Sequence, residues 1–343
     1  PPRTAPVAND FYHIPAKWGG RLSSVGRGRC TLKDIFLQVA QVLTVLLLSP
    51  LLHGFIVKME EKVQRGQGPS IFQPYWDLWK LFHKTQLVPE TATWVFFWAP
   101  VVAFVAMMIV PMLIPVLTNF PLPLSDMGDI LGGGLILTLG SFFILLAGLD
   151  TGQPFGGLGS SRAVMLGILA EPTLILVFVG ITFLDHSMLP FVANHLLAQS
   201  PVAYWSPAHI FLVLAFIILL TVETDRLPIH STIPYEIYMI DEARILEYSG
   251  PLLALLKWAS WMKQFILYTI FLNVFLFPWG LSVSGDFGSV LLALLVILAK
   301  YGAVGLFMVM VDTVQSRLRF YRYQEPLALS FLFAVLAIVA DQL

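Results

Sequence analysis

The chain has 343 residues, of which 57% are hydrophobic and 12% are charged, with a formal net charge of −1. An ordinary soluble domain carries about 25% charged residues, so this composition excludes a water-soluble globular fold and predicts an all-α integral membrane protein. The near-zero net charge gives no indication of a nucleic-acid partner. A single cysteine, Cys30, cannot form an internal disulfide or hold an iron–sulfur cluster, and the scattered histidines predict no zinc site.

The N-terminal residues 1–33 are polar, glycine-rich and basic. They lack the short apolar core and cleavage site of a secretory signal peptide, so we interpret them as a tail. The first long apolar run begins at Ile35 and is long enough to stay in the membrane. Residues 34–343 are therefore expected to form a single transmembrane helical domain.

Long apolar stretches recur along the rest of the chain. A helix needs roughly 20 apolar residues to cross a bilayer core of about 30 Å. About eight stretches reach or approach this length, the fifth and eighth being short: 35–57, 94–117, 129–149, 163–185, 207–223, 261–281, 289–312 and 327–342. Residues 188–198 are apolar but too short to cross, so we predict a short interfacial segment there.

Lysine and arginine residues are unevenly distributed among the loops between these spans. The loops after the odd-numbered spans are rich in them, whereas the other three loops contain none. The positive-inside rule then places the charged loops, including residues 58–93 and 224–260, in the cytoplasm, and both termini outside. The basic N-terminal tail disagrees with this orientation, so either it is translocated or it folds as an extra element on the inner side.

Two of the charged loops are more than linkers. Residues 74–84 place two tryptophans, two leucines and a phenylalanine against Asp77, Lys80 and Lys84, which predicts a short amphipathic helix along the membrane surface. The loop 224–260 is long and acidic. The two halves of the chain show no matched broken helices, so the signature of inverted-repeat transporters is missing.

Ionisable residues within the predicted spans are candidates for chemistry, because a charge inside a bilayer is costly and usually functional. Glu171 lies about one third of the way into the fourth span, and Pro172 frees a carbonyl of the preceding turn beside it. Lys263 is predicted near a helix end and Lys300 near the middle of a span. Each of these residues also has a purely structural interpretation. Glu171 could be a neutral, hydrogen-bonded carboxyl group in the packing, and Lys263 could extend its ammonium to the membrane interface. Asp150, at the end of the third span, could simply cap the helix.

The start of the acidic loop gathers ionisable side chains within 25 residues: Glu223, Asp225, Arg226, Glu236, Asp241, Glu242, Arg244 and Glu247. Such a pattern is often only a solvated face. Here large apolar residues are interleaved with the charges, which favours a packed loop. Carboxylates that are crowded together raise each other's pKa toward values useful for proton transfer, so this loop is a candidate functional site.

Over residues 34–343 the sequence resembles the membrane subunit shared by respiratory complex I and the complex-I-like (group 4) nickel–iron hydrogenases, including formate hydrogenlyase. The motifs that carry this resemblance are short, but their order and spacing together are specific. They are Gln64–Pro69, Asp77–Phe82, Leu149–Phe155, Gly159–Arg162, Leu169–Pro172, Glu223–Pro228, Leu246–Gly250, Lys257–Trp258, Lys263–Gln264 and Ser316–Arg319. The sequence departs from the family's pattern at Ile229, His230 and Ile233, and at Gly66–Gln67. These departures argue against quinone binding more than against the shared fold.

The resemblance implies a subunit at the junction between a peripheral redox arm and the membrane arm of an oxidoreductase, in a bacterial or archaeal inner membrane. Its partners would be iron–sulfur and hydrogenase-like large subunits, which hold the iron–sulfur clusters and in some complexes nickel–iron, and antiporter-like membrane subunits. This chain would hold no cofactor, metal or complete active site of its own. It would couple electron transfer to proton or ion translocation.

The same resemblance, together with the positions of the charges, assigns residues to roles. The candidates for proton transfer and its charge partners are Glu171, Asp150, Glu223, Asp225, Glu236, Asp241, Glu242, Glu247, Arg162, Arg226, Lys263 and Lys300. The candidates for docking partner subunits are Gln64, Gly68, Pro69, Asp77 and Lys80.

Two other functions stay open at this point. The chain could line the quinone site of a quinone-reducing complex-I-like enzyme, which bound quinone in the purified complex would indicate. It could instead be an autonomous ion transporter or channel, which stability of the chain on its own would indicate. The missing internal repeat speaks against the second alternative.

Overall fold

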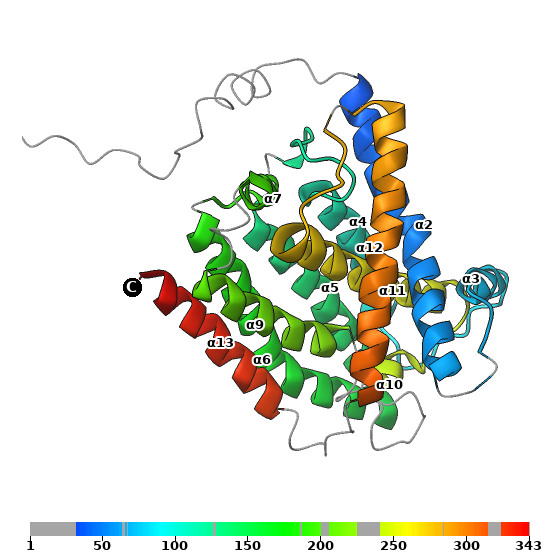
Figure 1. Cartoon of the computed structure of the whole chain (residues 1–343). Helices are drawn as coiled ribbons and strands as arrows, with labels where there is room; N and C mark the ends of the chain where they lie inside the picture. Colours follow the sequence, from blue (N-terminus) through cyan, green and yellow to red (C-terminus); the bar gives the residue numbers. More distant parts are fainter. Residues whose placement is uncertain are drawn as a thin grey trace, which may run out of the picture.

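The computed structural model is a bundle of long helices (Figure 1). It describes residues 32–63, 66, 68–125, 128–185, 187–199, 206–224, 241–283, 285–314 and 324–342. Within these ranges, seven helices are long and apolar enough to cross a membrane, and a shorter apolar helix adds an eighth candidate. The prediction of an all-α membrane protein with about eight spans is therefore confirmed.

The long helices fall close to the predicted stretches. They are α2 (Leu32–Val63), α4 (Trp94–Leu113), α5 (Ile130–Asp150), α6 (Pro154–Asp185), α9 (Pro207–Glu223), α11 (Gly250–Ile270), α12 (Phe287–Val314) and α13 (Gln324–Gln342). A π-helical segment, η3 (Phe271–Leu276), continues α11 without a break. Three short helices connect them: α3 (Gln73–Phe82), α7 (Pro190–Gln199) and α10 (Asp241–Ile245). Helices α3 and α7 match the short amphipathic and interfacial segments expected from the sequence.

Two helices begin earlier than predicted. Helix α6 begins at Pro154 instead of residue 163, and α11 begins at Gly250 instead of residue 261. Both have a proline in their first turn. Backbone N–H groups in the first turn of a helix have no partner within the helix, so a proline there loses no hydrogen bond. Helices extend past the apolar core of a membrane wherever other elements cover their ends. The loop between α9 and α11 therefore ends at Ser249.

The central helix of the bundle is α11. In its most hydrophobic stretch 78% of the residues are buried, compared with 28% for α12 and 22% for α13. It contacts α2, α3, α4 and α9, and in Figure 1 it runs behind α12 through the middle of the molecule. Its mean hydropathy of 1.2 is the lowest among these spans. Protein neighbours shield this helix from lipid, so it can carry polar side chains that a lipid-facing helix cannot.

Helix α2 is anchored to this centre at Pro50. A proline within a helix cannot donate to the carbonyl four residues before it, which here belongs to Leu46. The indole Nε1 of Trp258 on α11 donates to that carbonyl at 3.0 Å. The Tyr75 hydroxyl on α3 donates to the neighbouring carbonyl of Leu47. Two neighbouring helices therefore bond to carbonyls in the turn that precedes the proline.

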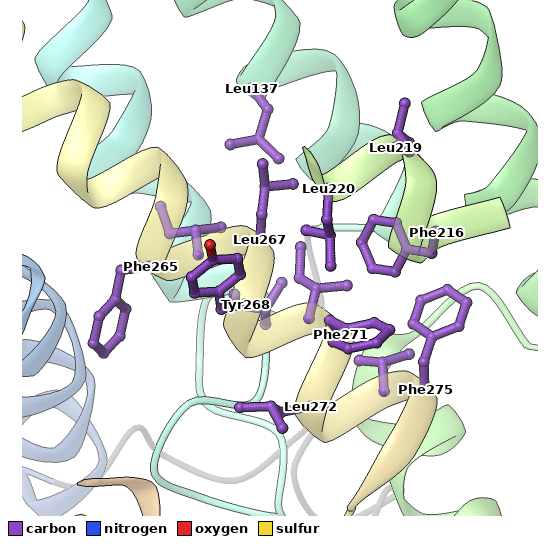
Figure 2. Packing of buried hydrophobic residues seen from close by; sticks show 14 of the residues in the cluster. Leu137, Phe216, Leu219, Leu220, Phe265, Leu267, Tyr268, Phe271, Leu272 and Phe275 are labelled. Carbon is purple, nitrogen blue, oxygen red and sulfur yellow. The ribbon is translucent and has the colours of Figure 1, made fainter. Parts of the chain in front are cut away.

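Aromatic packing fixes the short helix α9 against η3. Figure 2 shows Phe216 of α9 facing Phe271 and Phe275 of η3, and the ring centroids lie 5.7 and 4.8 Å apart. Leu219 and Leu220 extend the contact along α9, and both are fully buried. This packing sets the position of Glu223, which is the last residue of α9.

Candidate functional site

An ion pair joins the end of α9 to the middle of α11. The ammonium Nζ of Lys263 lies 2.7 Å from Oε2 of Glu223, and the two side chains are only 21% and 13% exposed. The same ammonium donates to the hydroxyl of Ser141 on α5 at 3.2 Å. One lysine therefore binds polar groups from two other helices inside the bundle. Lys263 is the fourteenth of the 27 residues from Gly250 to Leu276, so the expectation that it lies near a helix end is wrong.

A cavity of about 300 Å³ opens beside this ion pair. Its lining comes from α5, α6, α9, α10 and α11 and is mostly apolar. The polar residues in the lining are Thr138, Ser141, Glu171, Glu223, Arg244 and Lys263. A water molecule occupies roughly 30 Å³ in the liquid, so the cavity is large enough for several waters next to hydrogen-bonding groups.

Glu171 enters the cavity from α6 and interacts electrostatically with both Glu223 and Lys263. It is the eighteenth of the 32 residues of α6, so it lies near the middle of the helix and not one third of the way along it, as the sequence had suggested. Because Pro172 has no N–H, the carbonyl of Ile168 lacks its helical donor, and Ile168 also lines the cavity. Glu171 and the residue whose carbonyl lacks its helical donor, Ile168, therefore line the same cavity.

The short helix α10 brings a second cation to the cavity. Arg244 belongs to α10 and lines the cavity, while α10 packs against α5 and α6. Gly148 on α5 allows the close approach of α6, because a methyl group added there would lie 2.3 Å from Oγ of Ser160, whereas Cβ of Arg244 would be at an ordinary contact distance of 3.5 Å. Arg244 therefore lines the same cavity as Glu171 and Glu223.

The cluster contains two carboxyl groups, an ammonium and a guanidinium around one cavity. Of the two carboxyl groups, Glu223 is the one in direct contact with the ammonium of Lys263, at 2.7 Å. No contact as short as this is formed between Lys263 and Glu171 within the described residues. Of the two carboxyl groups, Glu171 is therefore the one that can gain and lose a proton without breaking an ion pair.

Asp150 lies outside this cavity and closes the start of α4. Its Oδ2 accepts from the backbone N–H of Thr93 at 2.8 Å, and its Oδ1 accepts from the Thr93 hydroxyl at 2.6 Å. Thr93 is the N-cap residue of α4, so Asp150 fixes the cap and joins the end of α5 to the start of α4. Nearby, the hydroxyl of Thr91 donates to the carbonyl of Thr151 at 2.7 Å.

Further contacts link the segment between α3 and α4 to the start of α11. The hydroxyl of Ser249 accepts from the N–H of Leu87 at 2.7 Å and bonds to its carbonyl at 3.1 Å. The ring of Tyr248 stacks on Phe96 with centroids 4.1 Å apart. Burial raises the pKa of the Tyr248 phenol, and the nearby carboxylate of Asp150 raises it further. We call the segment 83–93 together with residues 248–250 the inter-loop platform.

Lys300 lies at a separate polar site on the other side of α11. Its Nζ donates to the carbonyl of Phe277 at 2.6 Å and to Oδ1 of Asn273 at 3.0 Å. Asn273 belongs to η3, and α7 packs against this segment. Helices α7 and α10 lie at opposite ends of the bundle (Figure 1). The structure therefore separates the two membrane lysines into two different sites.

Comparison with known proteins places this bundle in a family. A sequence model described as NADH dehydrogenase matches residues 37–340. The chain belongs to the NADH dehydrogenase family. Among its relatives in Escherichia coli (strain K12), hydrogenase-4 component C is 31% identical over 314 residues, which cover 90% of this chain and 97% of the relative. Formate hydrogenlyase subunit 4 is 29% identical over 312 residues, which cover 90% and 98% of the two chains.

The fold is also shared within a solved complex. A chain of the membrane-bound sulfane sulfur reductase, described as an archaeal respiratory membrane complex, superimposes with a TM-score of 0.72. The match covers 89% of this chain and 98% of that chain at 20% sequence identity, so it shows the fold. The resemblance to complex I subunit 1 and to the hydrogenase branch, stated from the motifs, is confirmed by these relatives.

The structure of this NADH dehydrogenase family member brings together three of the residues predicted for proton transfer, Glu171, Glu223 and Lys263. Arg162 lies on α6 nine residues before Glu171, about 14 Å along the helix, and does not line the cavity. Glu247 is half-buried just after α10. The backbone of Asp241 and Glu242 forms the first turn of α10. Other predicted residues lie outside the described ranges: Gln64, Asp225, Arg226 and Glu236.

Most of the predicted docking residues lie on or near α3. Asp77 accepts a hydrogen bond from the side chain of Gln73 at 3.0 Å, one helical turn away, and Lys80 is exposed. Pro69 is exposed in the segment before α3. Gly68 packs on the last turn of α2, because a methyl group added to it would lie 2.8 Å from Cβ of Glu61. Whether these residues bind a partner stays a prediction.

The sequence reasoning missed three polar residues of the cavity. Arg244 was visible as one charge in the acidic loop, but nothing in the sequence showed that α10 would place it at the cavity that contains Glu171. Thr138 and Ser141 lie three residues apart in an apolar span, so they share one face of α5. That spacing was the available signal. Among the described residues, no group of three or more histidine, cysteine, aspartate or glutamate side chains is placed to hold a metal ion.

Proposed function

We propose that this chain is the membrane subunit of a complex-I-like respiratory complex of the hydrogenase or formate hydrogenlyase type. In that complex it couples electron transfer in partner subunits to the movement of protons. The relatives named as components of hydrogenase-4 and formate hydrogenlyase match about nine tenths of the chain, which supports this assignment. The observation that carries the coupling role is the group of Glu171, Glu223, Lys263 and Arg244 around one cavity.

The proposed docking surface for a peripheral redox arm consists of α3, the inter-loop platform and α10. Trp76 and Trp79 of α3 are about two thirds exposed, beside the exposed Lys80. The platform ties this region to the starts of α4 and α11. We propose that this side faces the cytoplasm and binds the iron–sulfur and hydrogenase-like large subunits. The antiporter-like subunits would bind elsewhere on the membrane-spanning part.

The mechanism follows from the unequal pairing of the two carboxyl groups. Electron transfer in the peripheral arm displaces α10, and Arg244 moves relative to the cavity. When Arg244 approaches Glu171, the carboxylate form of Glu171 is favoured and its proton leaves. When Arg244 withdraws, Glu171 takes up a proton. Lys263 holds Glu223 throughout, so the cavity keeps its shape while its charge changes.

The first experiment is purification of the complex in mild detergent through a tag on this chain. We expect co-purification of iron–sulfur proteins and nickel, and redox-driven proton uptake after reconstitution into vesicles. Iron without nickel, or bound quinone, would redirect the assignment to a quinone-reducing or other-acceptor complex. A chain that purifies alone, monodisperse and stable, would refute the subunit assignment and favour an autonomous transporter.

The second experiment tests Glu171 in that complex. We expect Glu171→Gln to preserve electron transfer and to lower proton translocation by about 100-fold, because a positioned proton-transfer group contributes on that order. Asp129→Asn is the matched control, since it removes an exposed carboxylate at the start of α5 that makes no side-chain cap hydrogen bond and does not line the cavity. If Glu171→Gln translocated protons at the rate of the unmodified complex, the cavity would have no part in coupling.

A further inference from the structure

The π-helical segment η3 creates a polar site around Lys300. In η3 the N–H of Phe277 bonds to the carbonyl of Leu272, five residues earlier, at 2.6 Å. This wider turn leaves the carbonyl of Phe277 and the side chain of Asn273 facing Lys300 on α12, which donates to both. Single π-helical turns within α-helices are rare and occur frequently at functional sites.

Side chains from other elements hold this site in place. The amide of Asn194 on α7 donates to the carbonyl of Asn273 at 2.5 Å. The ring Nε2 of His209 on α9 bonds to the carbonyl of Phe275 at 2.9 Å. The amide of Asn273 donates to the carbonyl of Pro115 at 2.9 Å. Three separate parts of the chain therefore hold η3, and with it the side chain of Asn273, in place beside Lys300.

The acceptors around Lys300 are all neutral. Within the described part of the chain no carboxylate lies within ion-pair distance of its ammonium, in contrast to Lys263 and Glu223. Lys300 is the fourteenth of the 28 residues of α12, about 20 Å along the helix from either end. A charge so far from both ends of a spanning helix is costly, and it usually marks a pathway for ions or protons.

We infer that Lys300 is a second proton-binding group of this chain, which loads and releases a proton at the η3 site; this rests on the proposed coupling function. An ammonium has three N–H donors, and only two are used here. On release, one N–H bond breaks, the electron pair stays on nitrogen, and the proton passes to a water molecule, which becomes hydronium. Loading reverses these steps. The neutral amine keeps two N–H donors, so both acceptors stay bonded.

Two pairs of hydrogen-bonded polar groups involve the part of α11 between Lys263 and η3. The amide of Gln264 donates to the hydroxyl of Tyr268 at 3.2 Å. The hydroxyls of Thr269 and Tyr301 form a buried hydrogen bond, and Tyr301 directly follows Lys300 on α12. Hydroxyl groups both donate and accept, so they are suitable partners for proton exchange. Burying these groups in a membrane bundle has a cost that a purely structural helix would avoid.

The test uses the complete complex in vesicles and two variants, one with a permanent positive charge and one with no charge at this position. Lys300→Arg keeps a cation and its donors but cannot lose a proton, and Lys300→Gln keeps a donor but cannot gain one. We expect both variants to keep the electron-transfer rate and to lose about tenfold or more in protons translocated per electron. Lys62→Arg is the control, since Lys62 is an exposed lysine in the last turn of α2.

The outcomes separate a proton carrier from a fixed charge. Unchanged translocation in Lys300→Arg would overturn the inference, because a permanent cation would then suffice. If only the complex with Lys300→Gln assembles, unchanged proton translocation in that variant would likewise overturn the inference. Failure of both variants to assemble would assign Lys300 a structural role and would also overturn the inference. An unmodified complex that translocates no protons would instead refute the proposed function.

Discussion

The two membrane lysines of this protein are stabilised in opposite ways on the two sides of one helix. Lys263 has a carboxylate 2.7 Å away and lies beside a cavity near α10. Lys300 has a backbone carbonyl and an amide oxygen, supplied by a π-helical turn near α7. At the first site a carboxylate stabilises the lysine ammonium, and at the second site the dipoles of neutral acceptors do so.

This difference determines what each site can do. Removing the proton from Lys263 would leave Glu223 as an unpaired carboxylate in a largely buried position, which is costly. Removing a proton from Lys300 leaves neutral groups beside neutral groups. The ion pair is therefore suited to hold structure, while the η3 site and Glu171 are suited to change protonation. The following changes test that comparison.

The largest effect is expected for Lys263→Met. It leaves Glu223 as a buried charge without its partner, so we expect the free energy of unfolding to fall by about 3–5 kcal/mol. Chemical denaturation in detergent micelles measures this change. The double variant with Glu223→Gln removes both charges and should recover much of the loss. A single-variant loss below about 1 kcal/mol would show that the pair is solvated and not a structural contact.

A smaller loss is expected for Lys300→Met, because no carboxylate is left behind. The variant loses two hydrogen bonds from a charged donor, each worth about 1.5–3 kcal/mol, but it also removes the cost of burying a cation, so we expect a net loss of about 2–3 kcal/mol. The same denaturation measurement compares it directly with Lys263→Met. If Lys300→Met were the more damaging of the two, the neutral acceptors would not be the reason for the difference between the sites.

Asn194→Leu tests whether the hydrogen bond from α7 stabilises η3. The change removes the donor to the carbonyl of Asn273 and leaves that buried acceptor unsatisfied, at about 1–2 kcal/mol. Hydrogen exchange of the Phe271–Leu276 amides should speed up more than exchange in the first half of α11. Equal acceleration along the whole of α11 would mean that Asn194 stabilises the helix generally and not the π-helical turn.

The smallest effect is expected for Ser141→Ala, which removes one acceptor from Lys263 while Glu223 stays in place. We expect a loss of about 0.5–1 kcal/mol. Thr138→Val is the matched control from the same helix face, because the Thr138 hydroxyl bonds within its own helix, to the carbonyl of Leu135. A control as damaging as Ser141→Ala would show that the effect comes from packing around the cavity.

The fold could be predicted largely from composition and pattern. A backbone in lipid has to satisfy its own hydrogen bonds, so long apolar stretches become helices. The start of α11 was misplaced because Lys257, Trp258 and Trp261 have the composition of a membrane interface. In the structure these residues belong to the helix, and Trp258 bonds to α2. Hydropathy does not show which helix is surrounded by other helices.

The sequence by itself determined the class of protein, the approximate spans, the short helices α3 and α7, and the family through its motifs. It also identified Glu171, Lys263 and Lys300 as costly charges within spans, and Glu223 as a member of the acidic loop cluster. Only the tertiary structure decided that three of them meet at one cavity with Arg244, while Lys300 lies at another site. The physical reason is that a charge is recognisable from its residue type, but its partner is set by helix packing between distant parts of the chain.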